Sequence, residues 1–210
     1  AMIREWRGDW QQYAGQHELP FLFVQLANYL EPKADPGDSA WAELRAAQAS
    51  ALSLDNTAMA VTIDAGEWND IHPLDKKVVG QRLAMAAANR VYGHTDVAAS
   101  GPQLASAKFD DEKAVLEFTH THKGLVAAPC TSHCTHREGN SKLHEFAIAG
   151  SDGRYHWANT RIVGDRVEVW SEQVQQPRSV RYAWADNPDE ANLYNGAGLP
   201  AAPFQADRTQ

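Results

Sequence analysis

Basic residues are scarce in this sequence. Its 210 residues include 19 Lys and Arg against 27 Asp and Glu, which gives a formal net charge of −8. That balance, together with the lack of a basic stripe, argues against a protein that follows the phosphates of nucleic acids. Long apolar runs are also lacking, since none approaches the roughly 20 residues needed to span a bilayer. We therefore expect a globular protein with neither nucleic acid nor membrane among its partners.

Cysteine is nearly absent as well. The two cysteines, Cys130 and Cys134, lie close to His133 and His136 in the segment PCTSHCTHREG. These are ligand types of a zinc site, but the spacing fits no common structural one. A short-loop disulfide in an exported protein is the favoured interpretation, with free thiols and zinc as the alternatives.

Helix and strand patterns alternate through the first half of the chain. Residues 1–13 open directly in an amphipathic helical pattern, and residues 41–54 are rich in Ala and Leu at helical spacing. Residues 20–28 and 57–66 are continuous apolar runs, typical of strands buried on both faces. Residues 76–93 form a further strong helix pattern. This order predicts a parallel α/β sheet.

The pattern changes near residue 98. Beyond it, short β-rich runs are separated by Gly, Asp and Pro turns such as SDG and VGD. These runs are AVLEFTHT, LHEFAIAG, RYHWANTRIV, DRVEVWS and SVRYAWA. We predict two domains, with residues 1–98 forming the α/β part and residues 99–210 an antiparallel β-rich part packed on it.

The loop 67-EWNDIHPLDK-76 carries the candidate chemistry. It leaves the carboxyl end of the strand predicted at 57–66, which is the edge where open α/β sheets place catalytic groups. In an extended segment, residues i and i+2 lie on one face. Asp70 can therefore reach the Nδ1–H of His72 and leave Nε2 free to take a proton from a serine. The alternative is that both residues only organise the turn before the next helix, which Asp75 is expected to cap.

No serine in the sequence is a convincing nucleophile. The letters GDS ending at Ser39 are the nucleophile motif of one large esterase class, and they precede Asp70 and His72 in the chain. That nucleophile follows directly on a buried strand, whereas Ser39 follows the turn segment EPKADP. Either Asp38 or Ser39 is better explained as the cap of the next helix. Ser151, in the segment GSDG, is typical of a hairpin turn.

Other histidines and aromatic residues have ordinary structural interpretations. His120 and His122 alternate along a predicted strand, so we expect them on one face, solvated or at the domain interface. Trp68, inside the candidate loop, fits either a wall for a sugar ring or packing against the domain. Three tryptophans on predicted strands are expected in the core: Trp157, Trp170 and Trp184.

Four stretches of the sequence form a recognisable set. They are LPFLFVQLANY, WAELRAAQ, MAVTIDAGEWNDIHPLDKKVVGQRLA and VRYAWADNP-x-x-ANLYN-x-AGLPAAPF. Together they resemble the sialate O-acetylesterase family, SGNH-class hydrolases that remove acetyl esters from sugars. The likeness runs from the first helix to Phe204 and corresponds to the C-terminal half of such a protein.

The resemblance implies an SGNH-type α/β/α parallel sheet followed by an antiparallel β-rich accessory domain. Residues 1–98 then form the second half of the catalytic domain. The family's serine lies in a Gly-Gln-Ser-Asn segment, and oxyanion-hole groups come from there and from a Gln-Gly-Glu-Ser segment. Neither segment occurs in this sequence.

The same resemblance matches Asp70 and His72 to the acid and base of the family. The wider SGNH class places its acid three residues before the histidine, where this chain has Asn69. His72 is therefore the firmer assignment. Glu67 and Asp64 are weaker candidates for the acid.

The expected function is that of a carbohydrate O-acetylesterase with a Ser-His-Asp mechanism, needing no metal or organic cofactor. The substrate is an acetylated carbohydrate such as sialic acid, xylan or xyloglucan units, and the resemblance implies a secreted or periplasmic location. Strands apolar on both faces need neighbours that residues 1–98 alone do not supply. We therefore expect a second polypeptide to carry the N-terminal catalytic segment and its serine. The competing hypothesis is a non-catalytic carbohydrate-binding or scaffolding fragment.

Overall fold

The computed structural model describes residues 1–14, 18–128 and 142–208 of the chain. Cys130 and Cys134, with the neighbouring His133 and His136, lie outside the described residues. The expected disulfide and its alternatives therefore stay predictions. Within the described residues, no helix combines the length and apolar character needed to cross a membrane.

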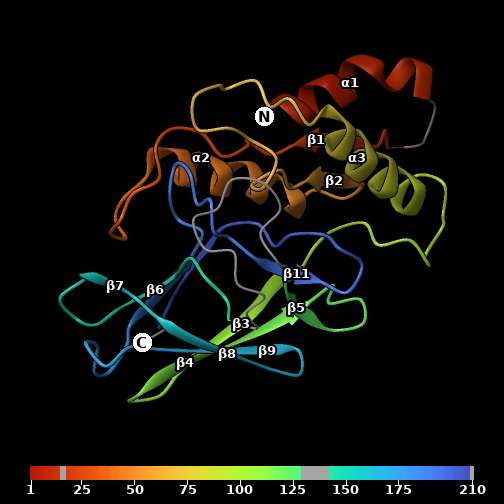
Figure 1. Ribbon diagram of the computed structural model, residues 1–210. Helices are drawn as coiled ribbons and strands as arrows, with labels where there is room; N and C mark the ends of the chain where they lie inside the picture. The colour runs from red at the N-terminus through yellow and green to blue at the C-terminus, as the bar shows by residue number, and fades with distance from the viewer. Residues whose placement is uncertain (15–17, 129–141, 209–210) are drawn as a thin grey trace.

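Helices and a small parallel sheet make up the first part of the chain (Figure 1). In chain order they are α1 (Met2–Ala14), β1 (Phe21–Val24), α2 (Ala40–Ala49), the short 3-10 helix η1 (Ser50–Ser53), β2 (Thr57–Ala60) and α3 (Lys76–Arg90). β1 and β2 pair in parallel, and α3 packs on both strands. The predicted alternation of parallel strands and helices is confirmed.

Two predicted caps begin the later helices. The Ser39 hydroxyl accepts the Ala42 N–H at 3.0 Å at the start of α2. Asp75 Oδ1 accepts the Val78 N–H at 3.1 Å at the start of α3. Each bond satisfies a donor of the first helical turn that has no partner within the helix.

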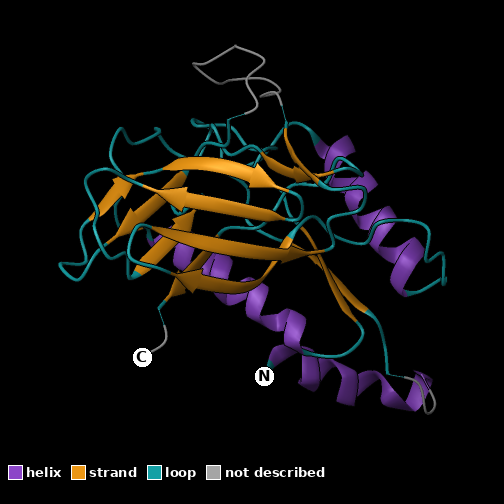
Figure 2. Ribbon diagram, turned by 90° about the horizontal axis from the view of Figure 1, so that it is seen from below, coloured by secondary structure: helices purple, strands orange, loops and turns teal. Residues whose placement is uncertain are grey.

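Antiparallel strands make up the rest of the chain (Figure 2). They are β3 (Gln103–Phe109), β4 (Lys113–Thr119), β5 (Leu125–Ala127), β6 (Phe146–Ala149), β7 (Tyr155–Trp157), β8 (Asn159–Val163), β9 (Arg166–Trp170), β10 (Ser179–Tyr182), β11 (Leu193–Asn195) and β12 (Phe204–Asp207). One sheet has the order β12-β10-β6-β7, another the order β3-β4-β9-β8, and β11 pairs with β5. The antiparallel character predicted for this part is confirmed.

The core of the antiparallel part is formed by alternate residues of the central strands. Its fully buried members include Leu116, Phe146, Ile148, Val167, Val169, Val180 and Tyr182. The rings of Phe146 and Tyr182 lie 4.7 Å apart between centroids, and Phe204 packs 5.5 Å from Tyr182. Because successive side chains of a strand point to opposite faces, the other face of each strand is left for polar residues and contacts with other elements.

The segment between β10 and β12 returns to the α/β part. Arg45 of α2 is fully buried and donates to four backbone carbonyls at 2.7–2.9 Å, those of Leu26, Ala27, Ala185 and Asp186. Burial lowers the pKa of Arg45 to about 10, opposed by the charge of Asp186, so the side chain stays protonated at neutral pH. One guanidinium therefore joins segments about 140 residues apart in the sequence.

The expectation that three tryptophans lie in the core is wrong for Trp157. This residue is 41% exposed on β7, the edge strand of its sheet. Trp170 on β9 is half-buried, and Trp184 is half-buried just beyond the end of β10. A strand pattern predicts which face of a strand an aromatic residue occupies. It does not predict whether that strand lies at the centre or at the edge of its sheet.

The expectation that His120 and His122 share one face of a strand is also wrong. β4 ends at Thr119, and both histidines have positive φ angles, of 57° and 35°. Positive φ is incompatible with an extended strand, so they belong to the turn between β4 and β5. Burial lowers the pKa of His120, helped by the positive charge of Arg90.

Candidate functional site

The loop between β2 and α3 carries the candidate residues Asp70 and His72 (gold in Figure 1). Its beginning is held against the loop after β1, because the Gly66 N–H donates to Asn28 Oδ1 at 2.6 Å. Only glycine fits here, since a Cβ on Gly66 would lie 2.0 Å from the backbone oxygen of Asn28. The other end of the loop is fixed by Asp75, the cap of α3.

A buried ion pair lies at the root of this loop. Asp64 accepts hydrogen bonds from Arg82 of α3 at 2.5 and 2.6 Å, and from the Tyr194 hydroxyl of β11 at 2.5 Å. Arg82 also donates to the Val61 carbonyl at 2.8 Å. Burial by itself raises the pKa of Asp64, but the bonds and charge of Arg82 and the Tyr194 bond outweigh it and hold the pKa below its usual value. Asp64 therefore joins α3 and β11 to the start of the loop and does not orient His72.

Asp70 and His72 are in direct contact. Asp70 Oδ1 lies 3.3 Å from Nδ1 of His72 and also accepts the His72 backbone N–H at 2.8 Å. Within the described residues, Asp70 is the only polar partner of the imidazole. Glu67 instead accepts the Leu74 N–H at 3.3 Å. Of the three candidate acids, only Asp70 touches the histidine, and the contact leaves Nε2 for another group.

Asp70, His72 and the residues around them are exposed to solvent. The His72 side chain is 85% exposed and that of Asp70 is 47% exposed. Three apolar residues of the same loop are also exposed: Trp68, Ile71 and Leu74. A polar contact in open water contributes little to stability. In this chain by itself, the pair is therefore open to solvent.

Ser39 is not placed to act as a nucleophile. It is 3% exposed, caps α2, and donates its hydroxyl hydrogen to Asp186 Oδ1 at 2.5 Å. Ser151 lies in the turn between β6 and β7, where the Gly153 N–H donates to the Gly150 carbonyl. Both structural interpretations of these serines are confirmed.

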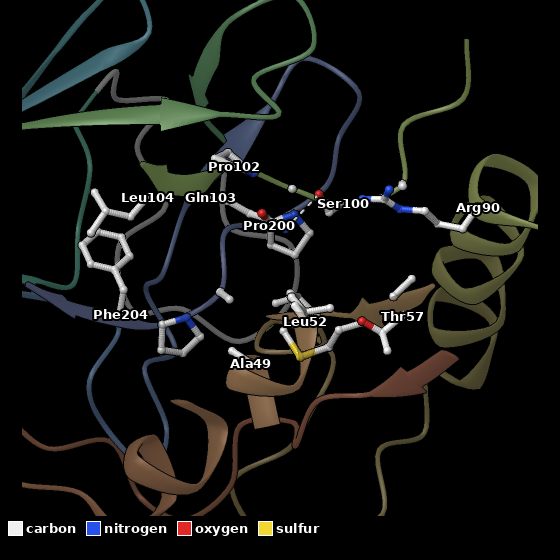
Figure 3. A pocket seen from close by; sticks show the side chains of 17 residues that line it. Ala49, Leu52, Thr57, Arg90, Ser100, Pro102, Gln103, Leu104, Pro200 and Phe204 are labelled. Carbon is white, nitrogen blue, oxygen red and sulfur yellow. Dashed lines mark hydrogen bonds between the residues drawn. The ribbon is translucent and has the colours of Figure 1, made fainter. Parts of the chain in front are cut away.

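A cavity of about 260 Å³ lies beside β2, between η1 and the antiparallel part (Figure 3). Its apolar walls include Leu52, Met59, Leu104, Pro200 and Phe204. Polar groups lie at one side, where Gln103 Nε2 donates to Ser100 Oγ at 3.4 Å and Arg90 extends from the end of α3. Neither Asp70 nor His72 lines this cavity. It therefore reflects the packing of the two parts and is not the candidate site.

Metal ligation has no candidate within residues 1–14, 18–128 and 142–208. No group of three or more His, Cys, Asp or Glu side chains there is arranged to hold an ion. The chemistry that the site offers is that of an oriented imidazole next to a carboxylate.

Comparison with known proteins identifies relatives of the chain. No protein-family model matches it. It is similar to the sialate O-acetylesterases of Pongo abelii and Homo sapiens, each 28% identical over 98% of this chain and 41% of the relative. It is also similar to the crystal structure of a carbohydrate acetylesterase from Xanthomonas citri, with 44% identity, a TM-score of 0.84, and coverage of 98% of this chain and 44% of the other. The resemblance to sialate O-acetylesterases is confirmed, and the chain spans about two fifths of their length.

Sequence reasoning missed Arg82 and Tyr194, the two residues that hold Asp64. Tyr194 lies within the run ANLYN, one of the stretches that carry the resemblance, but no sequence signal joined it to a site 130 residues earlier. Arg82 is a basic residue on the buried face of α3, and a charge at a buried position is the signal that could have identified it.

Proposed function

We propose that this chain is part of a carbohydrate O-acetylesterase, to which it supplies the base His72 and the orienting acid Asp70. The observation that carries the proposal is the contact of Asp70 with Nδ1 of His72 in a loop at the carboxyl end of a parallel strand. The relationship to sialate O-acetylesterases and to a carbohydrate acetylesterase supports the same reaction class. The substrate class is an acetyl ester on a sugar hydroxyl.

In this mechanism, His72 accepts a proton and then releases it in each of two steps. Nε2 takes the proton of a serine hydroxyl as that oxygen attacks the acetyl carbonyl, and Asp70 stabilises the imidazolium through Nδ1–H. The C–O bond to the sugar then breaks, and His72 gives the proton to the departing sugar oxygen. Water attacks the acetyl-enzyme with His72 again as base, releasing acetate and restoring the serine.

We propose that the serine belongs to a segment outside these 210 residues. Both serines tested from the sequence have structural roles, Ser39 as a cap and Ser151 in a hairpin turn. The relatives are more than twice as long as this chain, which leaves room for the missing group. Whether that segment is a separate polypeptide or is joined to this one does not change the chemistry.

The incomplete sheet supports a covering segment. Among the described residues β1 pairs with β2 alone, and its four residues are only half-buried, although the sequence predicts a strand buried on both faces. Parallel sheets in α/β proteins are normally covered on both faces and have more strands. The aromatic residues of α1 are also exposed: Trp6, Trp10 and Tyr13. A segment that completes an SGNH-type sheet at the free edge of β1 would supply the missing neighbours.

Covalent labelling tests this proposal. A serine-directed fluorophosphonate is added to this chain alone and to the longer assembly that contains it, and the labelled peptide is found by mass spectrometry. We expect label only in the assembly, on a serine outside these 210 residues. Label on Ser39 would overturn the assignment of the nucleophile. An assembly that neither takes label nor releases acetate would favour a non-catalytic carbohydrate-binding fragment.

A further inference from the structure

A second hollow lies between the two parts of the chain, away from the cavity of Figure 3. It is a groove of about 550 Å³ lined on one side by residues 35–38, from the loop before α2, and on the other by residues 153–157 of the β6–β7 hairpin. Gln173 and Arg181 complete its lining. In Figure 1 the loop before α2 extends toward β7, and residues of both segments line the groove.

An aromatic pair forms one wall of the groove. Tyr155 and Trp157 are two residues apart on β7, so both point to the same face of the sheet. That face is opposite to the one that carries Phe146 and Ile148 of β6 into the core, because Trp157 pairs with Ala147 and Tyr155 with Ala149. Trp157 remains 41% exposed.

The indole ring of Trp157 is held in a fixed orientation. Its Nε1–H donates to the carbonyl of Ala34, 123 residues earlier in the sequence, at 2.7 Å. An exposed tryptophan whose single polar atom is already bonded presents only an apolar surface. Such a ring loses little conformational freedom when a ligand packs on it.

The polar floor of the groove is equally rigid. The Arg181 guanidinium lies 3.9 Å above the Tyr155 ring centroid and donates to the Gly37 carbonyl at 3.2 Å and to Asp38 Oδ1 at 3.1 Å. Its side chain is only 12% exposed. Arg181 therefore joins the loop to the sheet and fixes the width of the groove.

The groove is lined by equal numbers of carboxylate and guanidinium groups. Its carboxylates belong to Asp35 and Asp38, and its guanidinium groups to Arg154 and Arg181. Arg181 is paired with Asp38, whereas Asp35 and Arg154 are exposed and have no ion-pair partner among the residues described. The groove thus offers one free carboxylate acceptor and one free fork of N–H donors beside a flat apolar ring.

We infer that this groove binds a neutral sugar residue. A pyranose ring has an apolar face of C–H groups, which packs on an indole, and a rim of hydroxyls, which both donate and accept hydrogen bonds. The carboxylate of Asp35 accepts from a hydroxyl, and the guanidinium of Arg154 donates to two neighbouring hydroxyl oxygens. A site with no net charge favours a neutral sugar over an acidic one.

The loop that borders the groove also borders the candidate catalytic loop. At its beginning, the Leu30 N–H donates to the Trp68 carbonyl at 3.0 Å, and at Ala34 it accepts from Trp157. A sugar chain held in the groove is therefore kept close to the part of the chain that carries Asp70 and His72. The binding itself does not depend on acetyl transfer, so it stands or falls separately from the proposed esterase activity.

Isothermal titration of the full chain tests the inference. The neutral probes are xylohexaose and cellohexaose, and the acidic probes are 3′-sialyllactose and trigalacturonic acid. We expect at least one neutral probe to bind and the acidic probes to bind at least tenfold more weakly. Trp157→Ala removes most of the stacking surface and is expected to weaken binding at least tenfold. Trp10→Ala, at a 58% exposed tryptophan of α1, is the matched control and leaves binding unchanged.

Arg154→Ala and Asp35→Ala provide an independent test of the groove in case Trp157→Ala disturbs the loop. Both side chains are exposed, so these variants are expected to fold normally and to weaken binding about tenfold for each lost charged hydrogen bond. Trp157→Phe retains a ring and is expected to recover part of the affinity. Absence of binding to both neutral probes, preference for the acidic probes, or binding unchanged by Arg154→Ala and Asp35→Ala would overturn the inference.

Discussion

Replacing Tyr194 by Phe removes one hydroxyl from the cluster that anchors the candidate loop. That hydroxyl donates to Asp64 Oδ2 at 2.5 Å in a buried site. A hydrogen bond to a charged group contributes about 1.5–3 kcal/mol to stability. Arg82 remains bound to Asp64 in the variant, so the carboxylate keeps a partner and the loss should stay in that range. For a chain of this size, each kcal/mol lowers the melting temperature by roughly 2–4 °C.

Urea unfolding at pH 7 measures the free-energy difference directly, with Tyr13→Phe, at a 75% exposed tyrosine of α1, as the control. The effect should also depend on pH. The pKa of Asp64 in the folded state lies below its usual value, so its contribution to stability is present above the unfolded pKa and is lost as pH falls through the folded one. Because Tyr194 helps to depress that pKa, the difference between wild type and variant should shrink at acid pH. A loss below about 0.5 kcal/mol at pH 7 would refute the docking of β11 on this loop.

Two other substitutions test an ionisable side chain and a helix cap. Desolvation of the Glu145 carboxyl, together with the negative charges of Asp189 and Glu190, raises its pKa to about 8, so the folded state binds more protons than the unfolded state between pH 4.5 and 8. Wild-type stability should therefore fall relative to Glu145→Gln as pH rises through that interval, and parallel urea midpoints across it would contradict the assignment. Ser39→Ala should lower stability by about 1–2 kcal/mol through loss of the α2 cap, while acetyl release by the assembled esterase stays within twofold. A loss of activity of 10³-fold or more in a folded Ser39→Ala variant would instead make Ser39 the nucleophile.

Local signals in the sequence were sufficient for the order of elements and for the caps. Ser39 and Asp75 are followed by strong helical patterns, and the physical basis of a cap lies within three residues. The contact between Asp70 and His72 was predictable for the same reason, since it joins residues two apart, although the segment forms a bend closed by the bond from the His72 N–H to Asp70 and is not extended as expected. These features require no knowledge of what surrounds them.

Features that depend on distant partners were not predictable. The exposure of Trp157 follows from the position of β7 at the edge of a sheet, which is set by the pairing of β6 with β10 and of β7 with β6 alone. The loss of strand geometry at His120 and His122 follows from a turn whose carbonyl groups are bonded by distant residues. Asn195 Nδ2 donates to the His120 carbonyl at 2.8 Å, and the Gly196 N–H donates to the carbonyls of Thr121 and Gly124. Periodicity reports which residues share a face but not which segment covers that face.

The candidate site also combines a local feature that the sequence predicted with distant contacts that it did not. The sequence favoured His72 as the candidate base and Asp70 as the candidate acid, with Glu67 and Asp64 as weaker candidates for the acid. The structure separates them by their partners, because Asp64 is bound by Arg82, Glu67 by a backbone N–H, and Asp70 by His72. The choice depended on a salt bridge to α3, which is a tertiary contact.

The most direct test of the central proposal is the activity of His72→Ala in the assembly that contains this chain. Acetate release from acetylated xylo-oligosaccharides should fall at least 10³-fold, because the serine loses its base, while His94→Ala, at an exposed histidine beyond α3, should retain full activity. Asp70→Asn should also be severely impaired, through the wrong imidazole tautomer. A folded His72→Ala assembly with activity within tenfold of wild type would contradict the account.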